Sequence, residues 1–553
     1  MKKILIGIVL VGVAVSCMDS PIDQVANTIT AENLMDHIEV LSSDEFQGRA
    51  TGTEGEEKTV DYLVNELQEY GLTGGAQDGG FIQDVPLVGQ KTNQDAELRI
   101  NTNGSATQFE YYSDFMAWPA NLQEEVSIED AELVYVGYGI QAPEENWDDF
   151  KDIDVEGKVL VVKNNDPSSK SDLFGGETRL YYGRYDYKYE KAKELGAAGV
   201  LIIHTTPSAG YSWEVVANSW SRERFYLRGN NGNEEAQTKF NGWLTKQAST
   251  ELFDEAGLDL EEQLEAAESR DFEPVPLEGM SLNLNLSAEY REQEAQNVLG
   301  VIEGNNDRLK DEYVVFTAHH DHLGVTSSAE GDSINNGALD NAAGVSAVLE
   351  MAKAYKEIQP QLKRSMLFLF VGAEEVGLLG SKYWADNPTI HPGKVTANIN
   401  LDGMNVYGKT RDLVLIGYDR NSVSDTIEKV TEERGRVVKP DPHPDRGYFY
   451  RSDHFPLAKK GIPAIFPNRG NEFIDKPERY SAMVDSLQDA NYHNVNDEIN
   501  KHWDLSGMEQ DVRLFFDAAY RIANANEMQT WRNGDEFKQM RLDMIEEASS
   551  SSN

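Results

Sequence analysis

The chain has 553 residues, of which 40% are hydrophobic and 9% are aromatic, so it can form two soluble globular domains with sizeable cores. Its 50 lysines and arginines stand against 95 aspartates and glutamates, which gives a formal net charge of −45. This charge repels nucleic acid and anionic lipid head groups, and both are excluded as partners. The acidic residues are scattered along the chain, which is typical of a solvated surface.

Residues 1–17 predict an export signal. Two lysines precede an apolar run over residues 4–15, and the only cysteine of the chain, Cys17, follows a serine. The run is too short for a permanent membrane helix. AVSC at residues 14–17 resembles a bacterial lipoprotein cleavage box, although Ala14 replaces the usual leucine. We therefore expect a lipid anchor at Cys17 that holds the exported protein in the bacterial cell envelope, periplasmic or at the surface; the alternative is a simple secretory signal.

Residues 25–124 are expected to form the first part of a catalytic domain. The pattern TEGE at 53–56 is typical of a capping box at the start of a helix. Apolar residues then repeat at helical spacing before Gly71: Val60, Leu63, Val64 and Leu67. The segment predicts an amphipathic helix of about five turns. Strand-like runs follow around residues 81–88 and 97–100.

Residues 125–279 are expected to form a second, inserted unit. It contains the strand-like runs ELVYVGYGI (132–140) and GKVLVVKNN (157–165), followed by a helix that runs into a strand, YEKAKELGAAGVLIIHTT (189–206). The unit carries no cluster of histidines and acids suited to chemistry. Its pieces resemble the protease-associated domain, a small β-rich domain often inserted in secreted peptidases, and the resemblance implies that this unit is such a domain.

Strands and helices alternate along residues 280–530, the expected main part of the catalytic domain. The strand-like runs are NVLGVIEG, EYVVFTAHH, SMLFLFVGAEE, VTANINLDG, DLVLIGY and GIPAIF, with helices after Asn341 and near residues 505–525. Alternation of this kind predicts a three-layer α/β/α sandwich over a mixed, largely parallel sheet. Active sites of such folds lie at the carboxyl ends of the strands. The tail, residues 534–553, is expected to be disordered.

Potential metal ligands stand where these apolar runs end. They are His319, His320, Asp321 and His322 after one run, Glu374 and Glu375 after another, Asp402 after a third, Asp340 at the head of a helix, and His493 beside Tyr492. Alone, each has an ordinary explanation, such as a helix cap or a loop histidine. Together they indicate a metal site with two divalent ions, because paired cations need bridging and terminal carboxylates, with imidazoles in the remaining positions. Such ligands suit two Zn²⁺ per chain, with Co²⁺ or Mn²⁺ as possible substitutes.

The motifs in this region resemble the co-catalytic zinc exopeptidases, which include secreted bacterial leucyl aminopeptidases and glutamate carboxypeptidases. The matching motifs are AHHDH (318–322), GALDNAAGVSAVLE (337–350), AEEVGLLGS (373–381), NINLDGMN (398–405), SDHFPLAKKGIPAIF (452–466) and YHNVNDE (492–498). The resemblance covers roughly residues 295–500. It implies an aminopeptidase that acts on peptides with a free N-terminus.

The resemblance also implies a role for each site residue. Asp340 would bridge the two metals, with His319 and Asp402 completing one site and Glu375 and His493 the other. Glu374 would be the general base and Tyr492 would stabilise the oxyanion. Adjacent residues that leave a strand point in different directions, which explains how one glutamate can bind metal while its neighbour takes a proton. Supporting roles fall to Asp321, which would orient an imidazole, to Asn341 in a cis peptide bond with Asp340, and to Ser452, Asp453 and His454 beside the substrate pocket.

One ligand position stays open, because His454 competes with His493 for the last metal position.

Three functional alternatives to the aminopeptidase also remain. A carboxypeptidase would need cationic groups, for which Arg446, Arg451 and Arg469 are candidates. A single-zinc glutaminyl cyclase shares the fold, and a metal-free receptor-like scaffold would lack activity altogether. The sequence does not indicate an oligomeric state or the preferred residue at the cleaved position.

Overall fold

The computed structural model describes residues 21–102, 104–167, 173–229, 238–326 and 331–550. The predicted export signal and Cys17 lie outside the described residues. Within the described part of the chain, no helix combines the length and the apolar character needed to cross a membrane.

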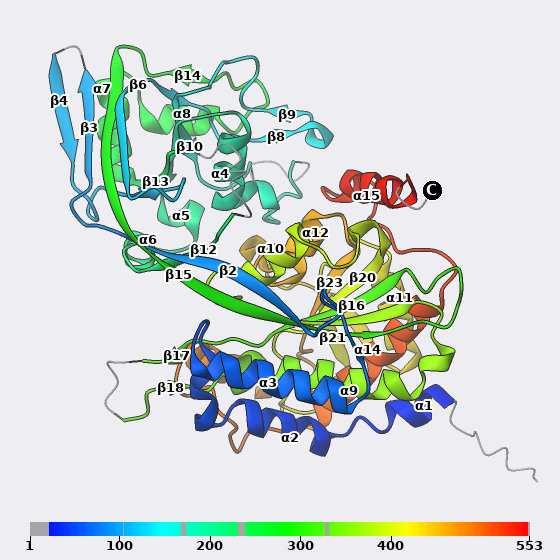
Figure 1. The fold of residues 1–553 in the computed structure, drawn as a ribbon. Helices are drawn as coiled ribbons and strands as arrows, with labels where there is room; N and C mark the ends of the chain where they lie inside the picture. The colour runs from blue at the N-terminus through cyan, green and yellow to red at the C-terminus, as the bar shows by residue number, and fades with distance from the viewer. Residues whose placement is uncertain (1–20, 103, 168–172, 230–237, 327–330, 551–553) are drawn as a thin grey trace, which may run out of the picture.

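A large mixed sheet forms the centre of the molecule (Figure 1). Its main strand order is β12-β2-β15-β19-β16-β20-β23-β21-β22, and β19, β16, β20 and β23 run parallel to one another. Antiparallel pairs flank this parallel centre, β2 and β15 on one side and β21 on the other. The strands are β2 (Ile82–Thr92), β12 (Arg224–Leu227), β15 (Met280–Ile302), β16 (Tyr313–His319), β19 (Ser365–Val371), β20 (Val395–Asn400), β21 (Asp412–Ile416), β22 (Val437–Pro440) and β23 (Ala464–Asn468).

Helices cover both faces of this sheet and complete three layers (Figure 1). One face packs against α2, α3, α9, α11 and α14 in a shared apolar core, and the other packs against α10 and α12. The predicted three-layer α/β/α sandwich is confirmed. These helices are α2 (Ala31–Leu41), α3 (Glu54–Glu69), α9 (Gly344–Glu357), α10 (Leu379–Asp386), α11 (Val423–Glu433), α12 (His454–Lys459) and α14 (Ser506–Asn524), with α1 (Pro21–Ala26) beside α14 and α13 (Tyr480–Asn491) near the end of the domain.

The central strands are buried along their whole length because helices lie on both sides. Every residue of β19 and of β20 is buried, and only the first residue of β16 is partly exposed. A strand covered on both faces reads as a continuous apolar run rather than as an alternating one. This is why the runs in the sequence located these strands well.

A second sheet of six strands lies beside the first, in the order β14-β7-β10-β11-β13-β5 (Figure 1). It begins with β5, so the predicted boundary at residue 125 falls after the first strand of this sheet. The assignment of this part as a protease-associated domain stays a prediction. The strands are β5 (Phe115–Pro119), β7 (Leu133–Tyr135), β10 (Val159–Lys163), β11 (Gly199–His204), β13 (Phe240–Thr245) and β14 (Val275–Pro276), packed with α4 (Tyr185–Glu194), α5 (Thr206–Ala209), α6 (Trp213–Trp220), α7 (Lys246–Glu255) and α8 (Leu260–Ala266).

One long strand, β15, serves both parts of the molecule. Its first residues pair with β3 and β6, and its later residues pair with β2 and then with β19. The 23-residue strand therefore runs from the side of the second sheet into the central sheet (Figure 1). Short strands complete this region and the loops: β1 (Thr73–Gly74), β3 (Glu97–Thr102), β4 (Ser105–Phe109), β6 (Glu125–Ala131), β8 (Gln141–Ala142), β9 (Trp147–Asp148), β17 (Gly324–Val325) and β18 (Ile334–Asn335).

The predicted helix after residue 53 is present as α3, with 16 residues, but its start differs from the predicted capping box. Thr53 is the N-cap residue, yet its side chain makes no capping hydrogen bond. Glu56 instead accepts hydrogen bonds from the backbone N–H groups of Gly52 and Gln296. The glutamate therefore joins the helix start to β15 rather than closing a local box.

The expectation of a disordered tail is wrong for residues 538–550, which form α15 (Lys538–Ser550). Arg541 is fully buried, and its guanidinium donates to the carbonyl oxygen of Val395 at 2.8 Å. Phe537 is also buried in an aromatic cluster with Trp531. A charged side chain that binds backbone carbonyls anchors this helix, and composition alone does not reveal such an anchor.

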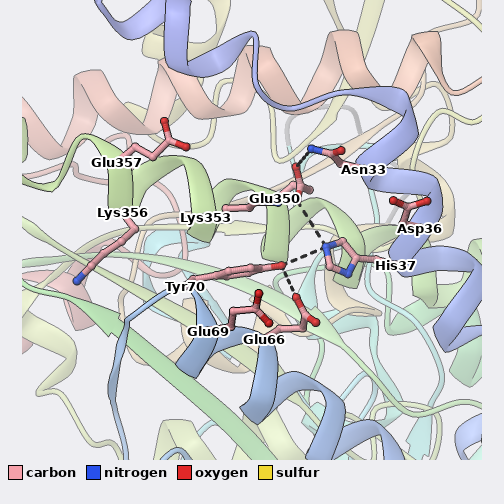
Figure 2. Close-up of a pocket in the computed structure, with 10 residues that line it drawn as sticks. All are labelled: Asn33, Asp36, His37, Glu66, Glu69, Tyr70, Glu350, Lys353, Lys356 and Glu357. Carbon is pink, nitrogen blue, oxygen red and sulfur yellow. Dashed lines mark hydrogen bonds and ion pairs between the residues drawn. The ribbon is translucent and has the colours of Figure 1, made fainter.

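A polar hollow lies between α2, α3 and α9 on the outer side of the helical layer (Figure 2). Its centre is the buried carboxylate of Glu350, which contacts Asn33, His37 and Lys353. Tyr70 connects His37 to Glu66 through its hydroxyl group. Glu350 and Glu66 are paired within the fold, and these contacts hold three helices together around α9, whose amino end follows the turn that carries Asp340.

Candidate metal centre

The carboxyl ends of three parallel strands bring the predicted ligands to one edge of the sheet. His319 is the last residue of β16, Glu374 and Glu375 follow β19, and Asp402 lies two residues after β20. Asp340 lies in the irregular turn Ala338–Ala343 that leads into α9. Since these strands run parallel and side by side, their ends converge.

His319 and two aspartates form the first group of donor atoms. His319 Nε2 lies 3.2 Å from Asp340 Oδ1 and 3.3 Å from Asp402 Oδ1. The imidazole is buried, which would lower its pKa, but Glu374 and Asp402 raise the pKa of His319 well above its ordinary value. A concentration of negative charge of this kind is what a divalent cation requires.

The second group shares Asp340 with the first. His493 Nε2 lies 3.3 Å from Asp340 Oδ2 and 3.0 Å from Glu375 Oε2. The two oxygens of Asp340 therefore face different histidines. Burial and Asp340 oppose ionisation of Glu375, yet hydrogen bonds from His322 and His493 lower its pKa.

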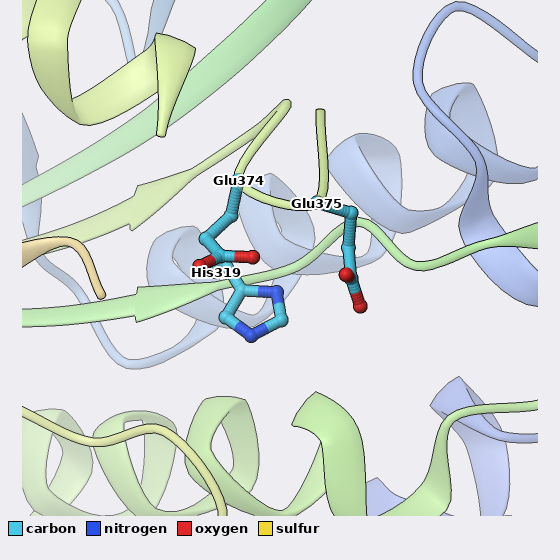
Figure 3. A group of neighbouring side chains, drawn as sticks. All are labelled: His319, Glu374 and Glu375. Carbon is cyan, nitrogen blue, oxygen red and sulfur yellow. The ribbon is translucent and has the colours of Figure 1, made fainter. Parts of the chain in front are cut away.

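Glu374 and Glu375 diverge from their adjacent backbone positions, as predicted. Figure 3 shows that the two side chains leave the loop separately, with Glu374 beside the ring of His319. One ligand atom each of His319, Glu374 and Glu375 nevertheless lie within 4.8 Å of one another. Burial raises the pKa of Glu374 well above its usual range, and Asp453 raises it further although His319 opposes this. A carboxylate with a raised pKa holds a proton more readily than an exposed one, and a bound cation would lower that pKa again.

Asp321 supports this arrangement through both its backbone and its side chain. Its carbonyl oxygen lies 3.1 Å from His319 Nδ1 and can accept a hydrogen bond from it, which leaves Nε2 facing the two aspartates. The carboxylate is 3.9 Å from Nδ1 but accepts hydrogen bonds from the backbone N–H groups of Glu374 and Glu375. The predicted orienting residue therefore positions the two glutamates through its side chain and the imidazole through its carbonyl.

The peptide bond between Asp340 and Asn341 is cis, as the resemblance implied. Asn341 is buried and joins three segments of the site. Its side-chain amide donates to the carbonyl oxygen of Leu401 at 3.0 Å, and its Oδ1 accepts from the N–H groups of Gly344 and Gly403. Asn341 thus fixes the start of α9 against the loop that carries Asp402.

The predicted pocket residues Ser452 and Asp453 are buried next to this centre. Ser452 Oγ donates to Asp402 Oδ2 at 2.6 Å and accepts from Asn400 Nδ2 at 2.7 Å. Asp453 accepts from Ser381 Oγ at 2.6 Å. The two contacts of Ser452 fix the orientation of Asp402, a ligand candidate.

Tyr492 and His493 form a stacked pair at the solvent side of the centre. Their ring centroids are 3.8 Å apart, and Tyr492 is 64% exposed. Partial desolvation and the carboxylates of Asp340 and Glu375 raise the pKa of Tyr492. The phenol therefore keeps its proton at neutral pH and can donate a hydrogen bond to a bound molecule.

His454 does not reach this centre. Its ring is buried, 4.6 Å between centroids from Phe449, and burial lowers the pKa of His454 to about 3. His320 also faces away, with Nε2 at 2.8 Å from the carbonyl oxygen of Gln296. The structure therefore brings His493, rather than His454, to the second group.

Three site residues lie elsewhere than expected or were missed. His322, predicted to face away or line the rim, has its Nδ1 2.7 Å from Glu375 Oε1. Asp497, inside the motif YHNVNDE, accepts hydrogen bonds from the N–H groups of Leu339 and Asp340. Buried Arg49 donates to carbonyl oxygens of both loops, at residues 320, 336 and 337. For Asp497, the motif itself was a usable signal.

The donor set fits zinc. Ligand atoms bound tetrahedrally at about 2.0–2.1 Å are about 3.3 Å from one another. The four distances between imidazole nitrogens and carboxylate oxygens across the two groups range from 3.0 to 3.3 Å. Imidazole nitrogen with carboxylate oxygen is also the ligand chemistry that zinc accepts. His319, Asp340 and Asp402 form one group that could hold an ion, and Asp340 and Glu375 form a second group with His322 or His493.

A cluster of imidazole and carboxylate donors at the carboxyl ends of parallel strands indicates a candidate metal-dependent active site. The family comparison is more specific: residues 297–515 match Peptidase family M28. This segment contains every residue that the structure brings to the two groups. The resemblance inferred from the motifs is confirmed for this part of the chain.

Two curated relatives and one solved structure illustrate the similarity. The chain is 32% identical over 135 residues to leupeptin-inactivating enzyme 1 of Streptomyces exfoliatus, covering 24% of this chain and 29% of the relative. It is 33% identical over 114 residues to Aminopeptidase YwaD of Bacillus subtilis, covering 20% and 22%. These matches span less than a third of either relative. An aminopeptidase from Aneurinibacillus sp. strain AM-1 aligns over 90% of this chain and 95% of its own at 20% identity, with a TM-score of 0.48.

Proposed function

We propose that the chain is a zinc-dependent aminopeptidase that releases N-terminal residues from peptides. The observation that carries this proposal is the pair of donor groups that share Asp340, with the carboxylate of Glu374 beside them. The similarity to an aminopeptidase and to a leupeptin-inactivating enzyme favours peptide substrates.

The roles of the side chains follow from their positions. Bound zinc supplies a water of lowered pKa and polarises the scissile carbonyl. Glu374, half-buried and beside His319, accepts the proton of that water and then delivers it to the leaving amine. The phenol of Tyr492 donates a hydrogen bond to the developing oxyanion. Asp321, Asn341 and Ser452 hold the ligands in place through the hydrogen bonds described above.

The carboxypeptidase alternative depends on free cationic groups. Arg469 is engaged by Gln488, Asn471 and Asp485, and Arg446 donates to Tyr448. Arg451 is the candidate whose side chain has no ion pair or hydrogen bond among the described residues. Arg451 could bind the carboxylate of a peptide in an aminopeptidase as well as in a carboxypeptidase. The two activities are distinguished by whether the substrate needs a free amine.

We expect the purified protein to hold two zinc ions, to hydrolyse amino-acid anilides, and to leave N-blocked peptides intact. Elemental analysis and a substrate panel measure these properties, and chelation should abolish hydrolysis because the water is activated only by the metal. One ion at saturating zinc would favour the single-zinc cyclase. Cleavage of N-blocked peptides alone would favour the carboxypeptidase, and neither zinc nor hydrolysis would favour the receptor-like scaffold.

We also propose export with a lipid anchor at Cys17, on the strength of the segment AVSC and the apolar run before it. Two results are expected in a bacterial host: incorporation of a radiolabelled fatty acid into the wild type, and none into Cys17→Ser, whose processing should stall. Equal labelling of both proteins would contradict the anchor. Processing of both without any label would leave a simple secretory signal.

A further inference from the structure

Three arginines gather where the second sheet's region meets the loop before Ser452. Arg179 and Arg184 belong to the segment that leads into α4, and Arg451 immediately precedes Ser452. We call these three side chains the arginine cluster. The proposed reaction does not use any of them.

Direct contacts bring the two segments together. The backbone N–H of Arg179 donates to the carbonyl oxygen of Pro444 at 3.1 Å. A Cβ at Gly447 would lie 3.4 Å from Cδ of Arg179, so the arginine side chain lies against this turn. Arg451 lies over the ring of Tyr448, 5.7 Å from its centroid. The cluster is therefore formed by two parts of the chain that are far apart in sequence.

The cluster has few counter-charges, although the chain carries a net charge of −45. Arg184 lies 3.6 Å from Asp186, whereas neither Arg179 nor Arg451 forms an ion pair within the described part of the chain. Arg179 donates to the carbonyl oxygen of Ser208 at 3.2 Å, and its Nε has no hydrogen-bond partner in the same described part. At least two guanidiniums thus keep unused capacity for an anion.

The pKa shifts of nearby groups agree with the closeness of the three arginines. Partial desolvation lowers the pKa of Arg451, and the charges of Arg184 and Arg179 lower it further. Burial raises the pKa of Tyr211, while the same three guanidiniums oppose that rise. The charge of Asp166 raises the pKa of Arg179. Burial raises the pKa of Asp166 itself to about 7, so this carboxylate is only partly ionised at neutral pH and neutralises the cluster incompletely. Like charges held close together favour binding of an anion.

The backbone of Arg451 lies close to the metal centre. Ser452 Oγ is 2.6 Å from Asp402 Oδ2, and adjacent Cα atoms are about 3.8 Å apart, so Arg451 Cα lies within about 9 Å of that carboxylate. An extended peptide advances about 3.3–3.6 Å per residue. A carboxylate one or two residues beyond the scissile bond is therefore at a suitable distance.

We propose that the arginine cluster binds a carboxylate of the peptide substrate beyond the scissile bond, so that the preferred substrates are dipeptides and tripeptides with a free C-terminus. The inference rests on the proposed aminopeptidase function. Guanidinium groups suit this role because their planar donors match a carboxylate. The carboxylate could also come from an acidic side chain just after the cleaved residue, and the experiment separates these two sources.

The experiment compares substrates that differ only in one charge. For the wild type, kcat/KM for leucyl-leucine should exceed that for leucyl-leucinamide about tenfold or more, and Arg451→Gln should remove most of this preference. Arg179→Gln should reduce it as well. The exposed Arg308 lies outside the cluster, and Arg308→Gln should keep the wild-type ratio. The pair leucyl-aspartamide and leucyl-asparaginamide tests the acidic side chain in the same way.

Calorimetry gives a reading that does not need hydrolysis. On the zinc-loaded full chain, a leucyl-leucine analogue with a reduced peptide bond should bind about tenfold more tightly than its amide, and Arg451→Gln should equalise the two. Equal affinities in the wild type, or a preference unchanged in both cluster variants, would overturn the inference. Failure of the proposed function would appear differently, as no hydrolysis of leucine anilide by any protein, while the binding comparison would still decide the role of the cluster.

Discussion

Glu374→Gln should retain both zinc ions and lose about 10²–10⁴-fold in kcat, the range typical of a lost general base. Glutamine is nearly isosteric with glutamate but cannot accept the proton of the attacking water. The side chain lies beside His319 and is the proposed proton acceptor rather than one of the five proposed ligands, so its replacement should leave the ligand set intact. Turnover of a leucine anilide and zinc content, measured on the same preparation, test this expectation.

Glu375→Gln is the matched comparison, since it makes the same chemical change one residue away. Its carboxylate lies 3.0 Å from His493 Nε2 and 2.7 Å from His322 Nδ1, so the neutral amide should weaken zinc binding. A zinc-depleted Glu374→Gln with a zinc-replete Glu375→Gln would reverse the two roles. Full activity in both would exclude both roles.

Asp340→Ala should lose both zinc ions, because one oxygen of this carboxylate faces His319 and the other faces His493. His493→Ala should chiefly weaken one ion, since its imidazole reaches only the second group. Zinc content during stepwise dialysis against a chelator distinguishes the two patterns. Asp307 is exposed and remote from both groups, and Asp307→Ala should behave like the wild type.

A variant of His454 tests whether this residue, rather than His493, is a metal ligand. This imidazole is buried beside Phe449, so His454→Ala should lower stability but keep both ions in the folded protein. If His454→Ala emptied a site while His493→Ala left both filled, the proposed ligand set would be wrong.

The fold of the catalytic part was predictable from the sequence because its central strands are covered on both faces. Residues 365–371 form an uninterrupted apolar run, whereas 395–400 alternate with Thr396, Asn398 and Asn400, and acidic residues follow both strands within a few positions at one edge of the sheet. The donor residues of the site could be named for the same reason. Most of them follow a strand or precede a helix at a recognisable position in a motif, and His493 follows α13 within the motif YHNVNDE.

Other features depend on contacts that no local pattern contains. His322 lies outside the regular strand, so strand alternation does not set the direction of its side chain, which turns toward Glu375. Arg49 and Arg541 read as surface charges but are buried against backbone carbonyls from distant segments. Glu56 satisfied a capping pattern, yet its partners include Gln296 on β15. Such long-range hydrogen bonds decide these positions, and local spacing carries no information about them.

The length of β15 has a mechanical consequence for access to the centre. The same continuous strand pairs with β3 and β6 at one end and with β19 at the other, and β19 leads directly to Glu374. Rotation of the outer region relative to the central sheet must therefore bend or twist this strand, since its two ends are held by different ladders of hydrogen bonds. The strand resists this bending and twisting. We therefore expect it to limit how far the two regions separate at the arginine cluster, and so the length of peptide that can enter.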